Sequence, residues 1–230
     1  MPSLARAERR IAEVIAGSGV PEDPGHSRNT LEWLLRLDPK ADPALRIAAL
    51  GHDIERAVEA RKVQRGDFAD YDAFKAAHAR NSAAMLGEIL RECGVGDETL
   101  TREVHRLVCL HEVGGDLHSD LLKDADSLSY FDVNLPLYFE RNGWQETHRR
   151  CVWGYRRLSE RARSMAEGLT WPGKELDDLM GEAIREAGVG VTPPASSPEA
   201  AAPPCAGTEI TLDGEGRLIP REDDVLGIVQ

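Results

Sequence analysis

Apolar residues recur every three or four positions, in one run after another, along the first 187 residues of this chain. This spacing gathers them on one face of an α-helix and leaves the charged residues on the other. Before Gly188 the sequence lacks the repeated period-two, β-branched runs that build sheets. We therefore predict an all-α fold. The expected helices cover residues 3–16, 29–37, 43–60, 74–93, 97–111, 117–141, 149–167 and 174–187.

The run over residues 43–60 is mostly apolar in its first half, which indicates a central helix. Its small residues Ala48, Ala49 and Gly51 should let neighbouring helices approach closely. Pro136 predicts a kink or a break in the run that contains it, because proline lacks a backbone donor and its ring clashes with the preceding turn.

The composition changes abruptly after the last helical run. Residues 188–207 are rich in Pro, Ala, Ser and Gly, which cannot bury a core, so we expect a flexible linker. Residues 208–230 form an acidic tail with two short apolar alternations around a glycine-containing turn. This pattern fits a small hairpin and a disordered tail equally well. The predicted organisation is thus a helical domain over 1–187, a linker and a tail.

Charge and cysteine usage limit the binding partners and the cellular compartment that we expect. The formal net charge is −12 at pH 7 and the pI is about 5.1, which argues against a surface that wraps nucleic acid, since such binding depends on Lys and Arg. The four cysteines form no CxxC pair and no secretory leader precedes them, so we expect a reducing cytoplasm. No stretch approaches the roughly 20 apolar residues of a membrane helix.

Histidines and aspartates are the residues that most strongly indicate function. Six of them occur in the order His26, His52, Asp53, His78, His111, Asp126. Buried imidazoles and carboxylates need compensating partners, and together they suit divalent Fe, Mn, Co, Ni or Zn. The absence of thiolates in the set disfavours a structural zinc site. We predict a shared metal site built from these six side chains.

The order of these residues resembles the HD superfamily of metal-dependent enzymes. That family has a histidine, a His-Asp doublet on a helix and a later aspartate, here found in Gly-His26-Ser-Arg, Leu-Gly-His52-Asp53 and Asp-Ala-Asp126-Ser-Leu. His78 and His111 match the variant with two further histidines. The resemblance covers about residues 1–168 and implies an HD-domain-like helical bundle.

The resemblance also implies a site and an activity. The variant typically holds two ions, with Asp53 bridging them; His26, His52 and Asp126 would bind one, and His78 and His111 the other. The implied function is a metal-dependent phosphohydrolase for a nucleotide or another small phosphorylated metabolite. Asp124 is the alternative to Asp126, and we expect it to orient a ligand instead.

Residues near these ligands are candidates for substrate binding and proton transfer. A substrate anion requires cations, and four of them lie two to four positions from a ligand. Some nucleotide-hydrolysing relatives have a glutamate where this chain has Arg56, so their water-positioning mechanism does not carry over. We expect His105 and His148 to be surface residues. The candidate substrate contacts are Arg28, Arg56, Arg80 and Lys123, and the candidate catalytic residues are Glu55, Glu112 and His118.

Two other functions fit the same sequence. Some relatives with a similar six-ligand site hold two irons and activate dioxygen to cleave a C–C or C–P bond. A non-catalytic ligand-binding or scaffold domain, with the linker and tail recruiting a partner, is a third hypothesis. The oligomeric state is not indicated by the sequence.

Overall fold

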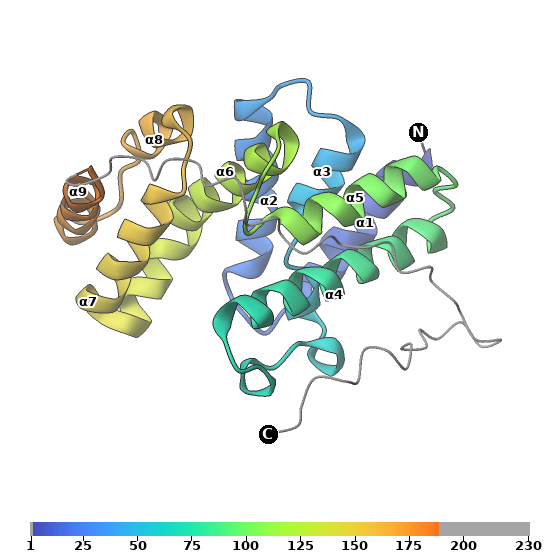
Figure 1. Ribbon diagram of the computed structural model, residues 1–230, viewed down its shortest axis with the longest axis horizontal. Helices are drawn as coiled ribbons and strands as arrows, with labels where there is room; N and C mark the ends of the chain where they lie inside the picture. The colour runs from blue at the N-terminus through green and yellow to red at the C-terminus, as the bar shows by residue number, and fades with distance from the viewer. Residues whose placement is uncertain (1, 189–230) are drawn as a thin grey trace. The chain divides into compact units, whose positions relative to one another are not determined.

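The computed structural model describes residues 2–188, and this part of the chain is helical with no strand, as the apolar spacing predicts (Figure 1). Its helices are α1 (Pro2–Ala16), α2 (Asp23–Leu37), α3 (Pro43–Gly51), α4 (Tyr71–Glu92), α5 (Glu98–Leu110), α6 (Leu117–Ser129), α7 (Leu135–Arg156), α8 (Glu160–Ala166) and α9 (Lys174–Gly188). The short 3₁₀ helices η1 (Ile54–Ala57), η2 (Glu59–Arg61) and η3 (Arg65–Asp67) lie between α3 and α4, and a π-helical turn, η4 (Tyr130–Asn134), joins α6 to α7. The predicted tail, with its hairpin, and the predicted linker after Gly188 lie outside the described residues. Within residues 2–188, no helix combines the length and apolar character needed to cross a membrane.

Helix α3 is the central helix of this fold. Nearly all of its side chains are buried, and it contacts α1, α2, α5 and α6. At its last residue, Gly51, a Cβ atom would lie 2.5 Å from a methyl carbon of Leu86 in α4. Ordinary contacts between carbon atoms are longer than this. The predicted close approach of a neighbouring helix is therefore confirmed at Gly51.

The prediction of one helix over residues 43–60 is wrong, because the α-helix ends at Gly51. The chain continues through His52 and Asp53 into η1 and η2. Glu55 is buried in η1, and its carboxylate accepts a hydrogen bond from the backbone N–H of Val63 at 2.7 Å. This buried bond ties the polar segment back toward the doublet, so tertiary contacts override the helical spacing.

Two other predicted boundaries also need correction. Helix α2 begins at Asp23 rather than at residue 29, because Pro24 is compatible with a first helical turn. This start places His26 inside the helix. The expected helix over 149–167 is interrupted before α8, where the side chain of Ser159 caps the new helix by accepting from Ala162 N–H at 3.3 Å.

Helices α7, α8 and α9 pack at the α6 side of the described unit (Figure 1). The predicted break near Pro136 takes the form of the π-helical turn just before it. Helix α7 approaches this turn closely at Gly154, where a Cβ atom would lie 3.0 Å from the ring of the buried Phe131. The indole N–H of Trp171 donates to the carbonyl oxygen of Phe131 at 2.8 Å, which fixes the segment before α9 to the same turn.

Candidate metal centre

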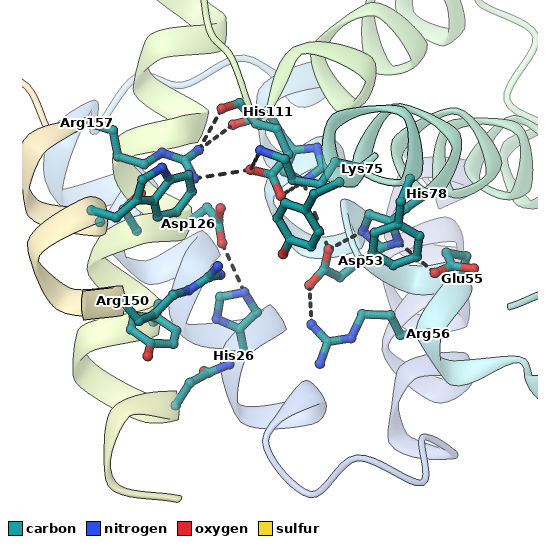
Figure 2. Close-up of a pocket in the computed structure, with 18 of the residues that line it drawn as sticks. His26, Asp53, Glu55, Arg56, Lys75, His78, His111, Asp126, Arg150 and Arg157 are labelled. Atoms are coloured by element: carbon teal, nitrogen blue, oxygen red, sulfur yellow. Dashed lines mark hydrogen bonds and ion pairs between the residues drawn. The ribbon is translucent and has the colours of Figure 1, made fainter. Parts of the chain in front are cut away.

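All six predicted ligands come together from separate parts of the helical unit, and Figure 2 labels His26, Asp53, His78, His111 and Asp126. Their nitrogen and oxygen atoms form two groups, and within each group the atoms lie within 4.8 Å of one another. The first group consists of His26 from α2, His52 after α3 and Asp126 from α6, and the second consists of Asp53, His78 from α4 and His111 after α5. Each group has the size and the donor atoms of a site for one metal ion.

The two carboxylates are central to these groups. In the first, Asp126 Oδ1 lies 3.2 Å from His26 Nε2 and 3.4 Å from His52 Nε2. In the second, Asp53 Oδ1 lies 2.8 Å from His78 Nε2 and 4.0 Å from His111 Nε2. The other oxygen of Asp53 is 3.8 Å from His52 Nε2, so Asp53 faces both groups.

Two of the imidazoles are oriented by the ends of the helices that carry them. His52 and His111 each follow the last residue of a helix, where backbone carbonyl groups lack a partner within the helix. His52 Nδ1 donates to the carbonyl oxygen of Ala49 at 3.1 Å, and His111 Nδ1 donates to that of Val108 at 2.7 Å. In both rings Nε2 is therefore the nitrogen that faces the carboxylates and can bind a metal ion.

The other two imidazoles are oriented by side chains. His26 Nδ1 lies 2.9 Å from Ser129 Oγ, and that hydroxyl donates to the carbonyl oxygen of His26 at 3.1 Å, so the ring nitrogen is the donor of the first bond. His78 Nδ1 donates to Glu55 at 2.6 Å. All four rings therefore keep Nδ1 occupied and direct Nε2 toward a carboxylate, the arrangement that protein metal sites use to fix a histidine ligand.

The buried atoms of this cluster fit a cation. His52 is 1% exposed, and its Nε2 is a buried atom without a hydrogen-bond partner in the described part of the chain. Buried polar atoms are nearly always satisfied, so an orphan of this kind requires an explanation. A divalent ion between imidazole nitrogens and carboxylate oxygens supplies one, and the donor set suits Fe, Mn, Co, Ni or Zn.

The pKa values in the cluster also indicate that its two carboxylates favour positive charge beside them. Burial alone would lower the pKa of His52, but the carboxylates of Asp53 and Asp126 outweigh it and raise that pKa to about 9. Burial alone would raise the pKa of Asp53, but His52 and Arg56 hold it well below the ordinary value. Burial alone would raise the pKa of Asp126, but the neighbouring imidazoles of His26 and His52 hold it well below the ordinary value. Both carboxylates stay ionised and attract cations.

A cavity of about 260 Å³ opens onto both groups, and three further predicted residues line it. Arg56 donates to Asp53 at 2.9 Å and pairs with the buried Asp23 at 2.9 Å. Glu55 bonds His78 and Val63, so it positions a ligand. Glu112 pairs with Arg157 at 3.1 Å.

Three predicted substrate contacts and one predicted catalytic residue do not line this cavity. They are Arg28, Arg80, Lys123 and His118. Arg28 and Arg80 are exposed, and Lys123 Nζ is bound to Asp120 at 2.7 Å. The ring of His118 lies 3.9 Å from Glu103 on the α5 side of the turn. The structure therefore does not bring these four side chains to the candidate site, and they are not carried into the proposed function.

Other histidines and the alternative aspartate also lie elsewhere. Asp124 is buried and accepts from the N–H of Ser159 at 3.0 Å, so it holds the start of α8 instead of orienting a ligand as expected. His105 and His148 are partly buried, and His148 pairs with Glu186 at 3.8 Å. Neither of these two rings lines the cavity.

The sequence did not predict several of the residues that line the cavity. One side of the cavity is lined by Lys75 of α4, by Arg150 and Trp153 of α7, and by Arg157, the residue directly after α7. A signal for three of them was present: positions 150, 153 and 157 are spaced by three and four, which places them on one helix face. What the sequence lacked was any indication that this face turns toward the histidines.

Over residues 2–188, the fold and the site together define an all-helical unit with two His/Asp groups that could hold metal ions. A family model described as a domain of unknown function (DUF4202) matches residues 6–179. The match includes all six candidate ligands and well over half of the chain, so the chain belongs to this family. No curated protein and no solved structure matched in the corresponding comparisons.

Proposed function

We propose that this chain is a metal-dependent phosphohydrolase, similar to HD superfamily enzymes, that acts on a nucleotide or another small phosphorylated metabolite. The observation that carries the proposal is the shared orientation of the four imidazoles. Each has its Nδ1 atom occupied and its Nε2 atom directed toward one of two carboxylates. A structural histidine has no need of this arrangement, whereas a metal ligand does.

The two groups would hold two ions. His26, His52 and Asp126 would bind one, and His78 and His111 the other, with Asp53 shared because its second oxygen faces His52 at 3.8 Å. When bound, two divalent transition-metal ions supply a hydroxide at neutral pH and positive charge that stabilises a phosphoryl transition state.

The protein's own residues would orient the substrate and move protons. Arg56 donates to Oδ2 of Asp53, the oxygen that faces His52, and so fixes the orientation of the shared carboxylate. Of the predicted proton carriers, Glu55 already accepts hydrogen bonds from His78 and from the N–H of Val63. Glu112 lines the cavity beside His111, so it is our candidate for a proton shuttle, which would take a proton from the attacking water and pass it to the leaving group.

Metal analysis followed by a substrate screen tests this proposal. The full chain would be purified without oxygen and analysed for metal, and then supplied with Mn²⁺, Co²⁺ or Ni²⁺ and a panel of phosphorylated metabolites. We expect two ions per chain and release of inorganic phosphate. The variant His52→Ala should lose both metal and activity, because it removes a buried ligand.

His148→Ala is the matched control, since His148 lies outside the cavity lining and should leave metal content and phosphate release unchanged. A chain that binds no metal would contradict the proposal. A chain with two irons that consumes oxygen and releases no phosphate would contradict the hydrolase and favour the oxygenase.

A further inference from the structure

Three cationic side chains surround one indole ring at the edge of the cavity. Lys75 Nζ lies 5.4 Å from the ring centroid of Trp153, and the guanidinium carbons of Arg150 and Arg157 lie 4.9 and 4.5 Å from it. We call these three cations around Trp153 the cation wall. Like charges repel at such separations, so the cluster requires negative charge nearby.

The described residues supply only part of that negative charge. Glu112 pairs with Arg157 at 3.1 Å and with Lys75 at 3.7 Å, and Lys75 also pairs with the exposed Asp72 at 3.6 Å. Arg150 has no carboxylate within 4.0 Å in the described part of the chain, and its guanidinium instead lies over the rings of Tyr130, at 5.3 Å, and Trp153. A half-buried guanidinium over two aromatic rings is held in place beside the cavity, and no carboxylate of the described residues lies close enough to form an ion pair with it.

The cation wall lines the same cavity as the candidate metal centre. Arg150 and Arg157 share the helix face of Trp153, and the close approach at Gly154 brings this face against the π-helical turn that follows α6. Figure 2 shows Arg150 and Arg157 on the side of the cavity opposite His78 and Arg56. A molecule in the cavity would therefore lie between Arg150 and Arg157 on one side and His78 of the second metal group on the other.

We propose that Arg150, supported by Lys75 and Arg157, binds the anionic oxygens of the substrate, and that the substrate class is a phosphate ester or anhydride carrying at least two negative charges. Neutral polyols and monocarboxylates offer less charge to this wall and should bind more weakly. This inference rests on the proposed function, because it assigns the cation wall to the substrate of that same site.

Binding of inorganic phosphate tests the inference without depending on turnover. The Mn²⁺-loaded full chain, freed of excess metal, would be titrated calorimetrically with phosphate, and its Mn²⁺ content would be measured in parallel. We expect Arg150→Gln to weaken phosphate binding by about tenfold or more, since it removes charge-assisted hydrogen bonds. Arg150→Lys keeps the charge but loses the planar pair of donors, so it should recover part of the affinity.

Arg149→Gln is the matched control, because Arg149 neighbours Arg150 on α7 but is exposed and pairs with Glu146. It should bind phosphate as the wild-type chain does. Circular dichroism would establish that the Arg150 variants are folded. Unchanged phosphate affinity in a folded Arg150→Gln chain, or no phosphate binding by the wild-type chain, overturns the inference.

The Mn²⁺ content of the wild-type chain distinguishes failure of the proposed function from failure of this inference. If the wild-type chain retains no Mn²⁺, the metal proposal fails, and the same titrations are made on the metal-free chains. Phosphate binding that Arg150→Gln weakens then still supports the cation wall, whereas equal binding in both chains overturns it.

Discussion

At the scale of single residues, Glu55 illustrates how a side chain without a ligand role can control a metal site. Its carboxylate accepts from His78 Nδ1 at 2.6 Å and from the N–H of Val63 at 2.7 Å, and it is 1% exposed. Burial of such a carboxylate is costly unless its oxygens are bonded. Glu55 therefore fixes the ring of His78 and anchors the segment after η2.

We predict that Glu55→Gln lowers the affinity of the second metal group by about 10- to 100-fold, because a neutral amide holds the His78 ring less firmly and makes it a weaker ligand. Competition titration with a chelating dye measures this. Glu59→Gln, at an exposed side chain paired with Lys62, is the matched control and should bind metal normally. Wild-type affinity in Glu55→Gln would contradict the positioning role.

The six ligands were accessible to sequence reasoning because their order along the chain matched a known pattern. Individual cations were not, because nearness in sequence does not decide which way a side chain points. Arg28 and Arg80 each follow a ligand histidine by two positions, which is about 200° around a helix, so they face away. Arg150 contacts the cavity although it is distant from every ligand in the sequence.

At the scale of elements, the close contact between Gly51 of α3 and Leu86 of α4 links helix packing to the candidate metal centre. Gly51 leaves room for Leu86 of α4 at the end of α3, and the residues that follow Gly51 are the doublet, while α4 carries His78. We predict that Gly51→Ala destabilises the fold by about 1 to 3 kcal/mol, because the added methyl group overlaps the buried Leu86. It should also weaken metal binding. Urea unfolding and metal titration measure the two effects.

Gly181→Ala provides the control for this substitution. Gly181 lies in α9, and its nearest neighbour would be the flexible tip of Arg185 at 3.4 Å. Alanine favours a helix over glycine by up to about 1 kcal/mol, so this variant should be as stable as the wild type or more stable. If both variants had the same stability and metal affinity, the close approach at Gly51 would not matter.

The capping box of α6 gives a pH-dependent prediction. Asp116 accepts from the N–H groups of His118 and Ser119 at 3.0 and 3.1 Å and pairs with Arg106. Burial alone would raise the pKa of Asp116, but the bonds from Arg106 and Ser119 outweigh it and lower that pKa to about 2. A lowered pKa means that the ionised cap stabilises the fold above the ordinary aspartate value and loses this effect as pH falls toward 2.

We therefore predict that Asp116→Ala lowers the free energy of unfolding by about 1 kcal/mol at pH 6, and that the difference from wild type shrinks between about pH 4 and pH 2. Asp116→Asn keeps a capping side chain that does not titrate, so it separates the two contributions. Urea unfolding across this pH range is the measurement. A difference that grows on acidification would contradict the sign.

At the scale of the whole molecule, the all-α architecture followed from apolar spacing, but the arrangement of α7 did not. The spacing shows which face of a helix is buried and leaves open which partner buries it. The packing of α7 against the π-helical turn depends on Gly154 and Phe131, which are 23 positions apart in the sequence. The side of the cavity formed by the cation wall therefore required three-dimensional information.

All six candidate ligands and the cation wall lie within one compact unit that ends at Pro194. A chain truncated after Pro194 should therefore keep the fold and the candidate metal centre. Because a ligand that binds the folded state stabilises it, we predict that Mn²⁺ at about 100 times its dissociation constant raises the free energy of unfolding of this truncated chain by about 2.7 kcal/mol for each site.

Thermal and urea unfolding of the truncated and full chains, with Mn²⁺ and with a chelator, measure this effect. The two chains should gain equally from Mn²⁺, and His52→Ala should gain much less in both because it removes a ligand of the first group. His148→Ala should respond as the wild type does. If Mn²⁺ stabilised the full chain but left the truncated chain unaffected, residues beyond Pro194 would contribute to the metal centre, and the six side chains would not be sufficient to form it.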